Sequence, residues 1–409
     1  MSSLANITVT DAKKEKWEAV VVGAGPAGAS AAYFLSKLGY KVLLIEAAKL
    51  PRPKACGDGI GPRAVAFLER LGLKNWLEEN NFYRIEHLRL VSASGAELIS
   101  TPQTSDYEIS YGYVIPRSVI DLKLVKQAIA AGSYYLEGYR ATDVLKEGQQ
   151  ISGVLLNNGQ PLVIKSQLTV VADGSSGKVS RLFGAKVGQV QAVGYRGYAL
   201  NLPDQKRTAS IIFTSQFPAG YAWIFPTNAT KANIGLGTLG LNKDRSSQGL
   251  KTAFNLTFKR LLNKEAVIEN ERLGATMRMN FAQRPAWFQG VAFVGDACGL
   301  VSPINGEGIS HALESGELLA EAFAAKPKNS YELNKSLATY EKLLQQKFSG
   351  YFKLGRLLVK LLAQPKRLDK LILKAQNDAE LKFLFIGIMA NTVHPRHLLK
   401  LKPLLKVLF

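Results

Sequence analysis

Residues 19–46 read AVVVGAGPAGASAAYFLSKLGYKVLLIE, and their pattern identifies the fold class. The runs 19–23 and 41–46 are short and apolar, which is typical of strands buried on both faces. Between them, residues 26–38 are rich in small side chains, have helical spacing and are followed by Gly39. The stretch therefore predicts a strand, a helix and a second strand of one parallel sheet.

Three glycines stand in the turn between the first strand and its helix. Gly23 permits a tight turn, Gly25 lets a pyrophosphate approach the backbone, and Gly28 lets the helix pack closely on the strand. The N–H groups at the start of the helix then point at the phosphate. Glu46 ends the second strand, where a carboxylate can hold the ribose hydroxyls of an adenosine. We predict a dinucleotide site formed by Gly23, Gly25, Ala27, Gly28 and Glu46.

A second glycine-rich motif lies late in the chain. Residues 290–308 read GVAFVGDACGLVSPINGEG, an apolar strand that ends in Gly295 and Asp296 and is followed by a turn and a helix. This arrangement resembles the second FAD motif of the glutathione-reductase-type flavoproteins. The resemblance implies that Asp296 binds the ribityl hydroxyls of FAD. It also implies that Gly306, Gly308 and Ile309 bring the start of a helix to the flavin, where its dipole stabilises negative charge.

Two shorter elements resemble cofactor contacts of the same flavoproteins. Arg117, in the sequence IPRSVID, matches an arginine near the ribityl and phosphate groups, and the competing interpretation is a surface salt bridge. Asp173 and Gly174 match an Asp-Gly element near the cofactor. We expect all three residues to contact FAD.

Two further motifs narrow the family. Residues 54–59 read KACGDG, and Pro218 to Pro226 give the pattern P-x-x-Y-x-W-x-F-P. With the two FAD motifs in this order, the chain resembles the geranylgeranyl reductase family of FAD-dependent oxidoreductases over roughly residues 17–330. The resemblance implies hydride transfer from reduced flavin to carbon–carbon double bonds of a prenyl chain, the chain being held in an apolar pocket.

The resemblance also suggests catalytic residues. Cys56 and Gly57 are expected near the flavin, with Cys56 either a proton donor or a small, inert pocket residue. Tyr221 and Trp223 are two residues apart, so they share one face of a strand, as pocket wall or as plain aromatic core. The four histidines form no ligand pattern, and no CxxC or HExxH occurs, so we predict no metal.

The pattern changes along the chain predict an α/β protein of three parts. A Rossmann-like FAD-binding domain is expected at 17–185 and 286–330, with part of 61–115 contributing to the substrate domain. Residues 186–285 alternate in the manner of an antiparallel sheet and are expected to form the substrate domain. Residues 331–409 are expected to be a basic helical region.

The charge is +20, and it is uneven. Residues 331–409 hold fifteen Lys or Arg against five Asp or Glu, interleaved with apolar residues as in basic amphipathic helices. This pattern fits either peripheral contact with a membrane or a solvated helix face, and it does not favour nucleic acid. Two cysteines, a polar start and no long apolar run lead us to expect a cytoplasmic protein, in part at a membrane surface.

The reductant and the reaction class stay open at this stage. No second G-x-G-x-x-G occurs, so the electrons are expected from NADPH that docks transiently or from a ferredoxin-type, acidic donor protein. One alternative function is a flavin-dependent monooxygenase or halogenase acting on an apolar or aromatic substrate, although Y-x-W-x-F-P differs from the W-x-W-x-I-P of tryptophan halogenases. Another is a lipid or quinone carrier in which FAD is only structural.

Overall fold

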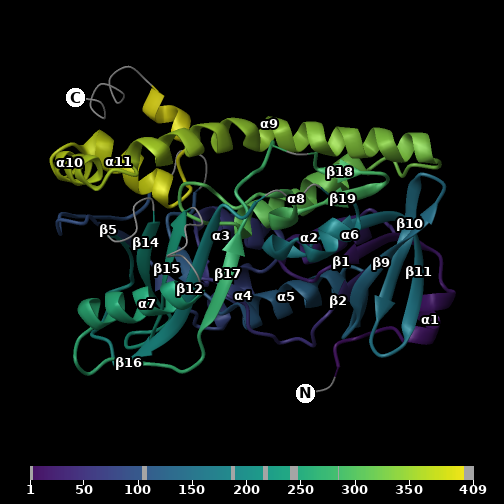
Figure 1. Ribbon diagram of the computed structural model, residues 1–409, viewed down its shortest axis with the longest axis horizontal. Coiled ribbons are helices and arrows are strands. Elements are labelled where there is room, and N and C mark those ends of the chain that lie inside the picture. The colour runs from purple at the N-terminus through teal and green to yellow at the C-terminus, as the bar shows by residue number, and fades with distance from the viewer. Residues whose placement is uncertain are drawn as a thin grey trace.

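The computed structural model describes residues 3–103, 108–185, 189–214, 220–239, 247–283 and 285–399. Pro218, the predicted boundary at residue 186 and residues 400–409 lie outside these ranges. The fold is α/β as predicted, with two large sheets side by side and helices from the C-terminal region along them (Figure 1).

The first sheet contains the predicted strand–helix–strand unit. Five adjacent strands, in the order β19-β11-β1-β2-β8, pair in parallel, and β9 and β10 extend β11 as an antiparallel meander. The strands are β1 (Trp17–Val22), β2 (Val42–Glu46), β8 (Tyr134–Glu137), β9 (Arg140–Glu147), β10 (Gln150–Asn157), β11 (Pro161–Val171), β18 (Trp287–Phe288) and β19 (Val291–Phe293).

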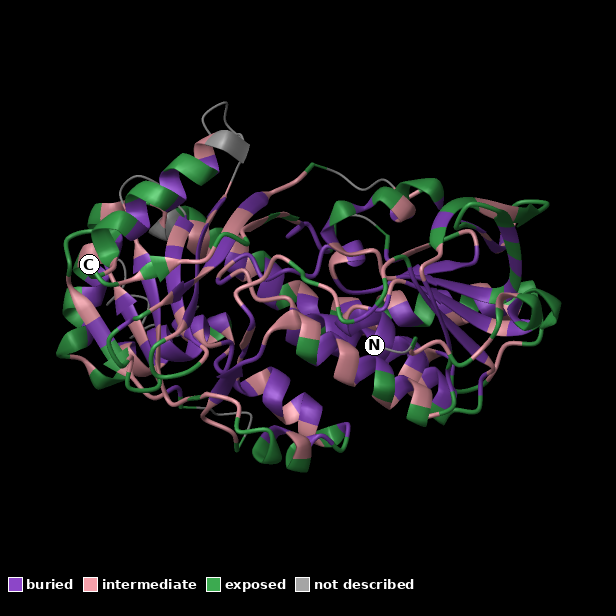
Figure 2. Cartoon of the chain, turned by 90° about the horizontal axis from the view of Figure 1, so that it is seen from below, coloured by how far each residue is buried: buried purple, intermediate pink, exposed green. Residues whose placement is uncertain are grey.

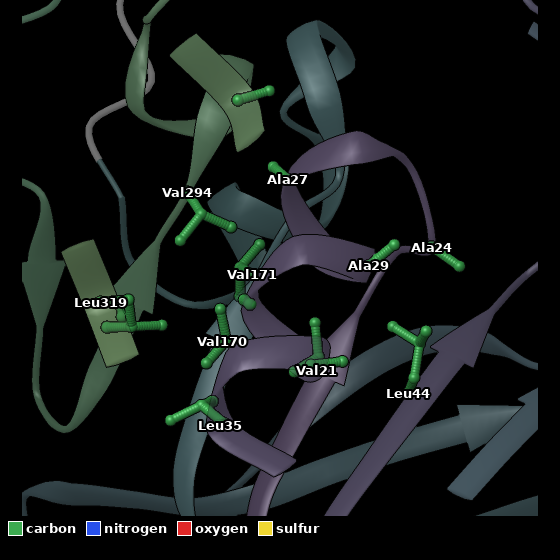
Figure 3. Close-up of a cluster of buried hydrophobic side chains, with 14 of the residues drawn as sticks. Val21, Ala24, Ala27, Ala29, Leu35, Leu44, Val170, Val171, Val294 and Leu319 are labelled. Carbon is green, nitrogen blue, oxygen red and sulfur yellow. The ribbon is translucent and has the colours of Figure 1, made fainter. Parts of the chain in front are cut away.

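Small residues let helices pack tightly on this sheet. A Cβ on Gly316 of α8 (Ile309–Ala322) would lie 2.5 Å from the Ala31 nitrogen of α2 (Pro26–Lys37), so only glycine allows the two helices this distance. Figure 3 shows part of the resulting core, a buried cluster that includes Leu35 of α2 with Val21, Leu44 and Val170 of the sheet. The helix α5 (Arg117–Ala130) also packs against α2.

The polar start of the chain is folded against the first sheet. It contains α1 (Val9–Lys14), whose first turn is capped by Thr8, because the threonine hydroxyl accepts from the Asp11 amide. The Leu4 amide and the Ser3 hydroxyl both donate to Glu137 at the end of β8. The segment therefore packs against the edge of the first sheet.

The second sheet is antiparallel apart from one pairing. A hairpin at residues 87–100 joins this sheet through β5, which pairs in parallel with β13. The strands run in the order β16-β12-β15-β14-β13-β5-β6, with β17 also on β12. They are β5 (His87–Val91), β6 (Glu97–Ser100), β12 (Ala192–Leu200), β13 (Thr208–Phe213), β14 (Gly220–Pro226), β15 (Ala232–Leu239), β16 (Val267–Ile268) and β17 (Leu273–Met277).

The two faces of the second sheet have different neighbours. One face is covered by α7 (Ser247–Leu261), whose Phe254 and Phe258 are fully buried against Ile234 and Leu236. The other face looks toward the first sheet and the C-terminal helices. Figure 2 shows the strands of both sheets largely buried, while exposed residues gather on helix faces and loops.

The basic C-terminal region is helical as predicted, but its amphipathic stretch is broken. The residues 351–374 belong to two helices, because Pro365 cannot continue a helix and instead begins the next one. The helices are α9 (Ser330–Leu362), α10 (Pro365–Gln376), α11 (Ala379–Met389) and the 3-10 turn η4 (Pro395–Leu399). None of the described helices is apolar over enough length to cross a membrane.

The remaining elements connect these layers. A small third sheet has the strand order β3-β7-β4. Its strands and the short helices are β3 (Gly59–Ile60), β4 (Arg84–Ile85), β7 (Gly112–Val114), α3 (Pro62–Arg70), α4 (Lys74–Glu79), α6 (Lys178–Leu182), η1 (Gly174–Ser176) and η3 (Gly295–Cys298).

Candidate active site

One cavity of about 1240 Å³ brings almost all predicted site residues together. It is lined from the first sheet, the second sheet and the C-terminal helices. The predicted residues on its wall are Gly23, Gly25, Ala27, Glu46, Cys56, Gly57, Arg117, Asp173, Gly174, Tyr221, Trp223, Asp296, Gly306, Gly308 and Ile309. Gly28 does not line the cavity. The individual roles of these residues stay predictions.

The three glycines of the first motif differ in what surrounds them. A Cβ on Gly28 would lie 1.8 Å from the Gly23 oxygen, and a Cβ on Gly23 would lie 2.4 Å from the Ala172 oxygen. Gly23 also has a φ of +108°. These two are therefore needed by the backbone itself. A Cβ on Gly25 would meet nothing nearer than the Arg117 Nη2 at 3.8 Å, so Gly25 leaves space open at the start of α2.

Glu46 lies at the end of β2 with both carboxylate oxygens engaged. Oε2 accepts from the Ala24 amide at 3.0 Å and from Arg52 Nη2 at 3.1 Å, and Oε1 accepts from the Ala48 amide at 3.1 Å. Burial alone would raise the pKa of Glu46, but Arg52 and the two amides outweigh it and lower the pKa. The carboxylate is thus ionised and held against the glycine turn.

Arg117 is an interior arginine and not the surface salt bridge considered as its alternative. Its Nε and Nη2 donate to the two carboxylate oxygens of Asp121 at 2.7 and 2.9 Å, and Asp121 is fully buried. Arg52 Nη1 reaches the same Asp121 at 3.1 Å. The guanidinium also hydrogen-bonds Cys56, and its ion pair with Asp121 outweighs burial to raise the pKa of Arg117. Arg52 and Asp121 were missed from the sequence, although Asp121 stands one helical turn after Arg117.

The two aspartates of the predicted cofactor contacts have different surroundings. Asp296 lies at the end of the first sheet in η3, accepts from the Ser175 hydroxyl at 2.8 Å, and has its pKa raised by burial. Asp173 instead accepts from the Val179 and Ser180 amides at 2.8 and 3.0 Å and so holds the start of α6. Asp173 therefore supports the wall of the cavity locally, and Gly174 forms the adjoining backbone.

The start of α8 forms another part of the wall. Gly306 has a φ of +67°, and Gly308 is the N-cap of the fourteen-residue helix, where it provides no side-chain hydrogen bond. Glu307 accepts from the Ser310 amide at 2.7 Å. Gly306, Gly308 and Ile309 line the cavity, so the positive end of the α8 dipole lies beside it.

The Cys56 loop is tied to the second sheet by a buried polar network. Asn233 of β15 donates through Nδ2 to the Cys56 oxygen at 2.9 Å and to Asp58 Oδ2 at 2.8 Å. The Tyr198 hydroxyl also donates to Asp58, which is fully buried and has its pKa raised by that burial. The Trp223 Nε1 donates to Asn233 Oδ1 at 2.9 Å. Asp58 stands in the KACGDG motif but was not predicted as a site residue, and Tyr198 and Asn233 carried no recognisable signal in the sequence.

Tyr221 and Trp223 share a face of β14 as predicted, with ring centroids 6.1 Å apart. Trp223 lies over Gly235, where a Cβ would be 2.1 Å from the indole. The Tyr221 hydroxyl donates to the Asn305 oxygen, which ties the sheet to the turn before α8. Both polar hydrogens are therefore used by the protein, and what the two side chains offer the cavity is ring surface.

The far end of the cavity is apolar. Leu88 and Ile211 of the second sheet face residues of α10 and α11, among them Leu368, Phe385 and Met389. Figure 1 shows α10 and α11 at the end of the molecule near β5 and β14. The helical region, for which sequence suggested only a basic surface, thus closes one end of the cavity.

Cys56 lies on the cavity wall within electrostatic reach of both Arg117 and Tyr221. The side chain is half-buried, burial raises the pKa of its thiol, and the neighbouring Arg117 opposes this with a smaller effect. The cysteine is thus a thiol at neutral pH. No group of His, Cys, Asp or Glu within the described ranges could hold a metal ion.

The polar part fits a dinucleotide. An open position at Gly25 before a helix, an ionised carboxylate at Glu46 and the buried Arg117 are what a phosphate and a ribose require. A family model described as an FAD binding domain matches residues 16–343, most of the chain. The chain belongs to the geranylgeranyl reductase family of FAD-dependent oxidoreductases.

Named relatives agree with this assignment. The chain is similar to a menaquinone reductase of Mycolicibacterium smegmatis, with 30% identity over 391 residues and 92% of each chain covered. It is also similar to digeranylgeranylglycerophospholipid reductase 3 of Methanosphaera stadtmanae, with 28% identity, 95% of this chain and 98% of the relative.

Solved structures show the same fold. A geranylgeranyl bacteriochlorophyll reductase-like protein of Thermoplasma acidophilum superposes with a TM-score of 0.81 at 23% identity, covering 96% of each chain. A flavin-dependent brominase superposes with a TM-score of 0.76 at 20% identity, covering 96% of this chain and 97% of the brominase. At these identities the likeness concerns architecture, which is shared by reductases and halogenases alike.

Proposed function

We propose that this FAD-dependent oxidoreductase reduces carbon–carbon double bonds in the prenyl chain of a lipid. The observation that carries the proposal is the continuity of one cavity from the Gly25 and Glu46 side to the apolar end under α10 and α11. A long apolar chain and a redox cofactor can share such a cavity, with water largely excluded from the reacting carbons.

The reduction needs a hydride and a proton. When bound and reduced, FAD supplies a hydride to one carbon of the double bond. We assign the proton for the other carbon to the Cys56 thiol, which is protonated because burial raises its pKa and which Arg117 would stabilise as the thiolate. Water then returns the proton. Tyr221 and Trp223 hold the chain by ring contact, since their own polar hydrogens are already donated.

A larger side chain at the apolar end of the cavity tests where the prenyl chain of the substrate lies. Met389→Trp places a larger side chain on the cavity wall, whereas Leu384→Trp enlarges a buried residue of the same helix that does not line the cavity. We expect Met389→Trp to slow reduction of geranylgeranyl diphosphate about tenfold or more but to spare geranyl diphosphate, because a short chain does not reach α11. Product mass measures both rates.

The control variant distinguishes a blocked cavity end from general overpacking of α11. Leu384→Trp should change the two rates equally or not at all, and Cys56→Ala should slow both substrates alike while FAD stays bound. If Met389→Trp slowed the short and long chains equally, α11 would not limit the chain, and the proposed substrate position would be wrong.

A monooxygenase or halogenase is the second candidate function. The brominase likeness favours it only at the level of fold. Substrate-dependent consumption of dioxygen with formation of an oxygenated or halogenated product would support it over the reductase.

The substrate and the electron donor are proposed at the level of class. The relatives are named for menaquinone and for a digeranylgeranyl glycerophospholipid, which have prenyl chains in common, so we propose a prenyl lipid of one of these kinds. We propose NADPH or an acidic ferredoxin-type protein as the reductant, since the charge of +20 would attract either.

A further inference from the structure

A cation with unused hydrogen-bond donors lies on the cavity wall. Arg196 of β12 is 4% exposed and lines the cavity. Its Nη2 donates to the Lys54 oxygen at 3.3 Å, whereas its Nε and Nη1 have no hydrogen-bond partner among the residues that the structure describes. A buried charge with unsatisfied donors is unfavourable unless a further group binds it.

The buried Asp58 and the exposed Glu271 compensate this charge in part, but neither accepts a hydrogen bond from Nε or Nη1. Glu271 Oε1 is 3.7 Å from Nη2, but the Glu271 side chain is 58% exposed, so solvent screens the pair. The guanidinium carbon lies 4.8 Å from the centre of the Tyr198 ring. Such stacking stabilises the cation and leaves its N–H groups available to an acceptor.

The register of the second sheet places Arg196 in line with the aromatic wall. Arg196 pairs with Gly235, Gly235 with Trp223, and Trp223 with Ile211, so these residues share one face. Neighbouring strands are about 4.8 Å apart, so the backbones of Arg196 and Trp223, two strands apart, are separated by about 10 Å. Ile211 lies one strand beyond Trp223. The row therefore runs from a cation to the apolar end under α10 and α11.

We propose that Arg196 binds an oxyanion, a phosphate or a carboxylate, at the head of an amphiphilic ligand whose chain extends past Trp223. The position of the prenyl chain rests on the proposed function. The inference adds to it a head-group subsite that selects anionic ligands. Guanidinium binds such groups with two charge-assisted hydrogen bonds, which matches the two unpartnered nitrogens. A phosphate of NADPH offers the same chemistry, and the experiment separates the two sources.

Binding to the oxidised, FAD-loaded protein tests the subsite without turnover. The ligands are geranylgeranyl diphosphate, the uncharged geranylgeraniol, and NADPH, and dissociation constants come from titration calorimetry. The variants are Arg196→Met, which keeps an unbranched side chain, and Arg272→Met as the matched control. Arg272 is a neighbouring cation that lies against Phe254 near α7 and does not line the cavity.

We expect Arg196→Met to weaken the binding of geranylgeranyl diphosphate about tenfold or more, because a charge-assisted contact is lost. The binding of geranylgeraniol should weaken by less than about twofold. Arg272→Met should change neither. If Arg196→Met weakens the binding of NADPH and not that of the diphosphate, Arg196 does bind an oxyanion, but the oxyanion belongs to the electron donor. Equal weakening of the diphosphate and the alcohol, or unchanged affinity for every ligand, would overturn the proposal.

Thermal unfolding checks that the variant folds. Without ligand, Arg196→Met should unfold no lower than the parent, because it removes a buried and unsatisfied charge. Inorganic pyrophosphate should raise the unfolding temperature of the parent and of Arg272→Met but not of Arg196→Met. Loss of FAD from Arg196→Met with pyrophosphate binding retained would assign the arginine to the cofactor and contradict the inference. Anion binding through Arg196 without any alkene reduction would refute the proposed function alone.

Discussion

Single residues in the glycine turn have separable tasks. Gly23 and Gly28 allow backbone segments to approach each other, as their 2.4 and 1.8 Å hypothetical Cβ distances show. Gly25 has no such constraint from the protein and faces the cavity. A side chain at Gly25 would therefore compete with a ligand and not with the fold.

Gly25→Val should yield a folded protein that has lost its cofactor. We expect the FAD content after purification to fall about tenfold or more, because the valine occupies the approach to the N-terminus of α2, while the unfolding temperature of the FAD-free protein stays within a few degrees. Gly28→Val should instead fail to fold. Flavin absorbance per protein and circular dichroism measure both, and a fully flavinylated Gly25→Val would contradict the dinucleotide site.

Which site residues could be predicted depends on how far apart in the sequence the contacting residues are. Gly23, Gly28 and the shared face of Tyr221 and Trp223 could be predicted, since a strand–helix turn and a strand period are local features. The bonds that join Asp58 to Asn233 connect positions 175 residues apart. Only the fold brings such residues together, so no local pattern could show them.

At the scale of elements, three helices are joined by one buried carboxylate. Glu314 of α8 accepts from Arg63 of α3 at 2.6 and 2.7 Å and lies 3.2 Å from Lys347 of α9. Burial would raise the pKa of Glu314, but Arg63 outweighs burial and lowers the pKa from 4.5 to about 2. The helix that faces the cavity is thereby fixed to two neighbours.

Glu314→Gln should destabilise the protein by about 3 kcal/mol at neutral pH, because it leaves Arg63 without its carboxylate. Since the folded pKa lies below the unfolded one, this stabilisation is fully present above about pH 4.5 and is lost as the pH falls toward about 2. Denaturant unfolding at several pH values gives the difference between parent and variant.

Glu317→Gln is the matched control, because Glu317 also joins α8 to α3, through Arg70 at 3.0 and 3.2 Å, but at the surface. Glu317→Gln should lower the free energy of unfolding by less than about 1 kcal/mol. A difference between parent and Glu314→Gln that did not change with pH would show that the Glu314 charge is not the cause.

At the scale of the whole molecule, charge and cavity meet at the C-terminal helices. α10 closes the apolar end of the cavity with Leu368 and carries exposed Lys366, Lys370 and Lys374 beside the half-exposed Leu373. The predicted peripheral contact with a membrane would place the end of the cavity that takes the prenyl chain next to the lipid. We keep this contact as a proposal.

Replacing Lys366, Lys370 and Lys374 by glutamine should weaken binding to vesicles that contain anionic lipid by about tenfold or more, since each lysine contributes to electrostatic attraction. The same replacement at the exposed Lys13, Lys14 and Lys165 near the opposite end of the molecule is the control for net charge. Co-sedimentation measures both. Equal loss in the two triple variants would mean that overall charge, and not α10, causes the binding.

The larger architecture was predictable where the hydrophobic period was clear. The parallel unit, the antiparallel strands after residue 192 and the helical C-terminal region follow from it. The part played by α10 and α11 in the cavity did not, because helix packing over a distant sheet depends on tertiary contacts between residues such as Met389 and Ile211. How the chain divides into domains stays a prediction.

The central claim is that the cavity supports alkene reduction by a flavin. The most direct measurement is anaerobic: the FAD-loaded protein is reduced with dithionite, geranylgeranyl diphosphate or menaquinone is added, and flavin absorbance and product mass are followed together. The account predicts that one of these prenyl substrates reoxidises the flavin without oxygen and gains about two mass units in its prenyl chain, and not in a quinone ring, for each flavin reoxidised. A flavin that stays reduced with both substrates until oxygen is admitted would contradict it.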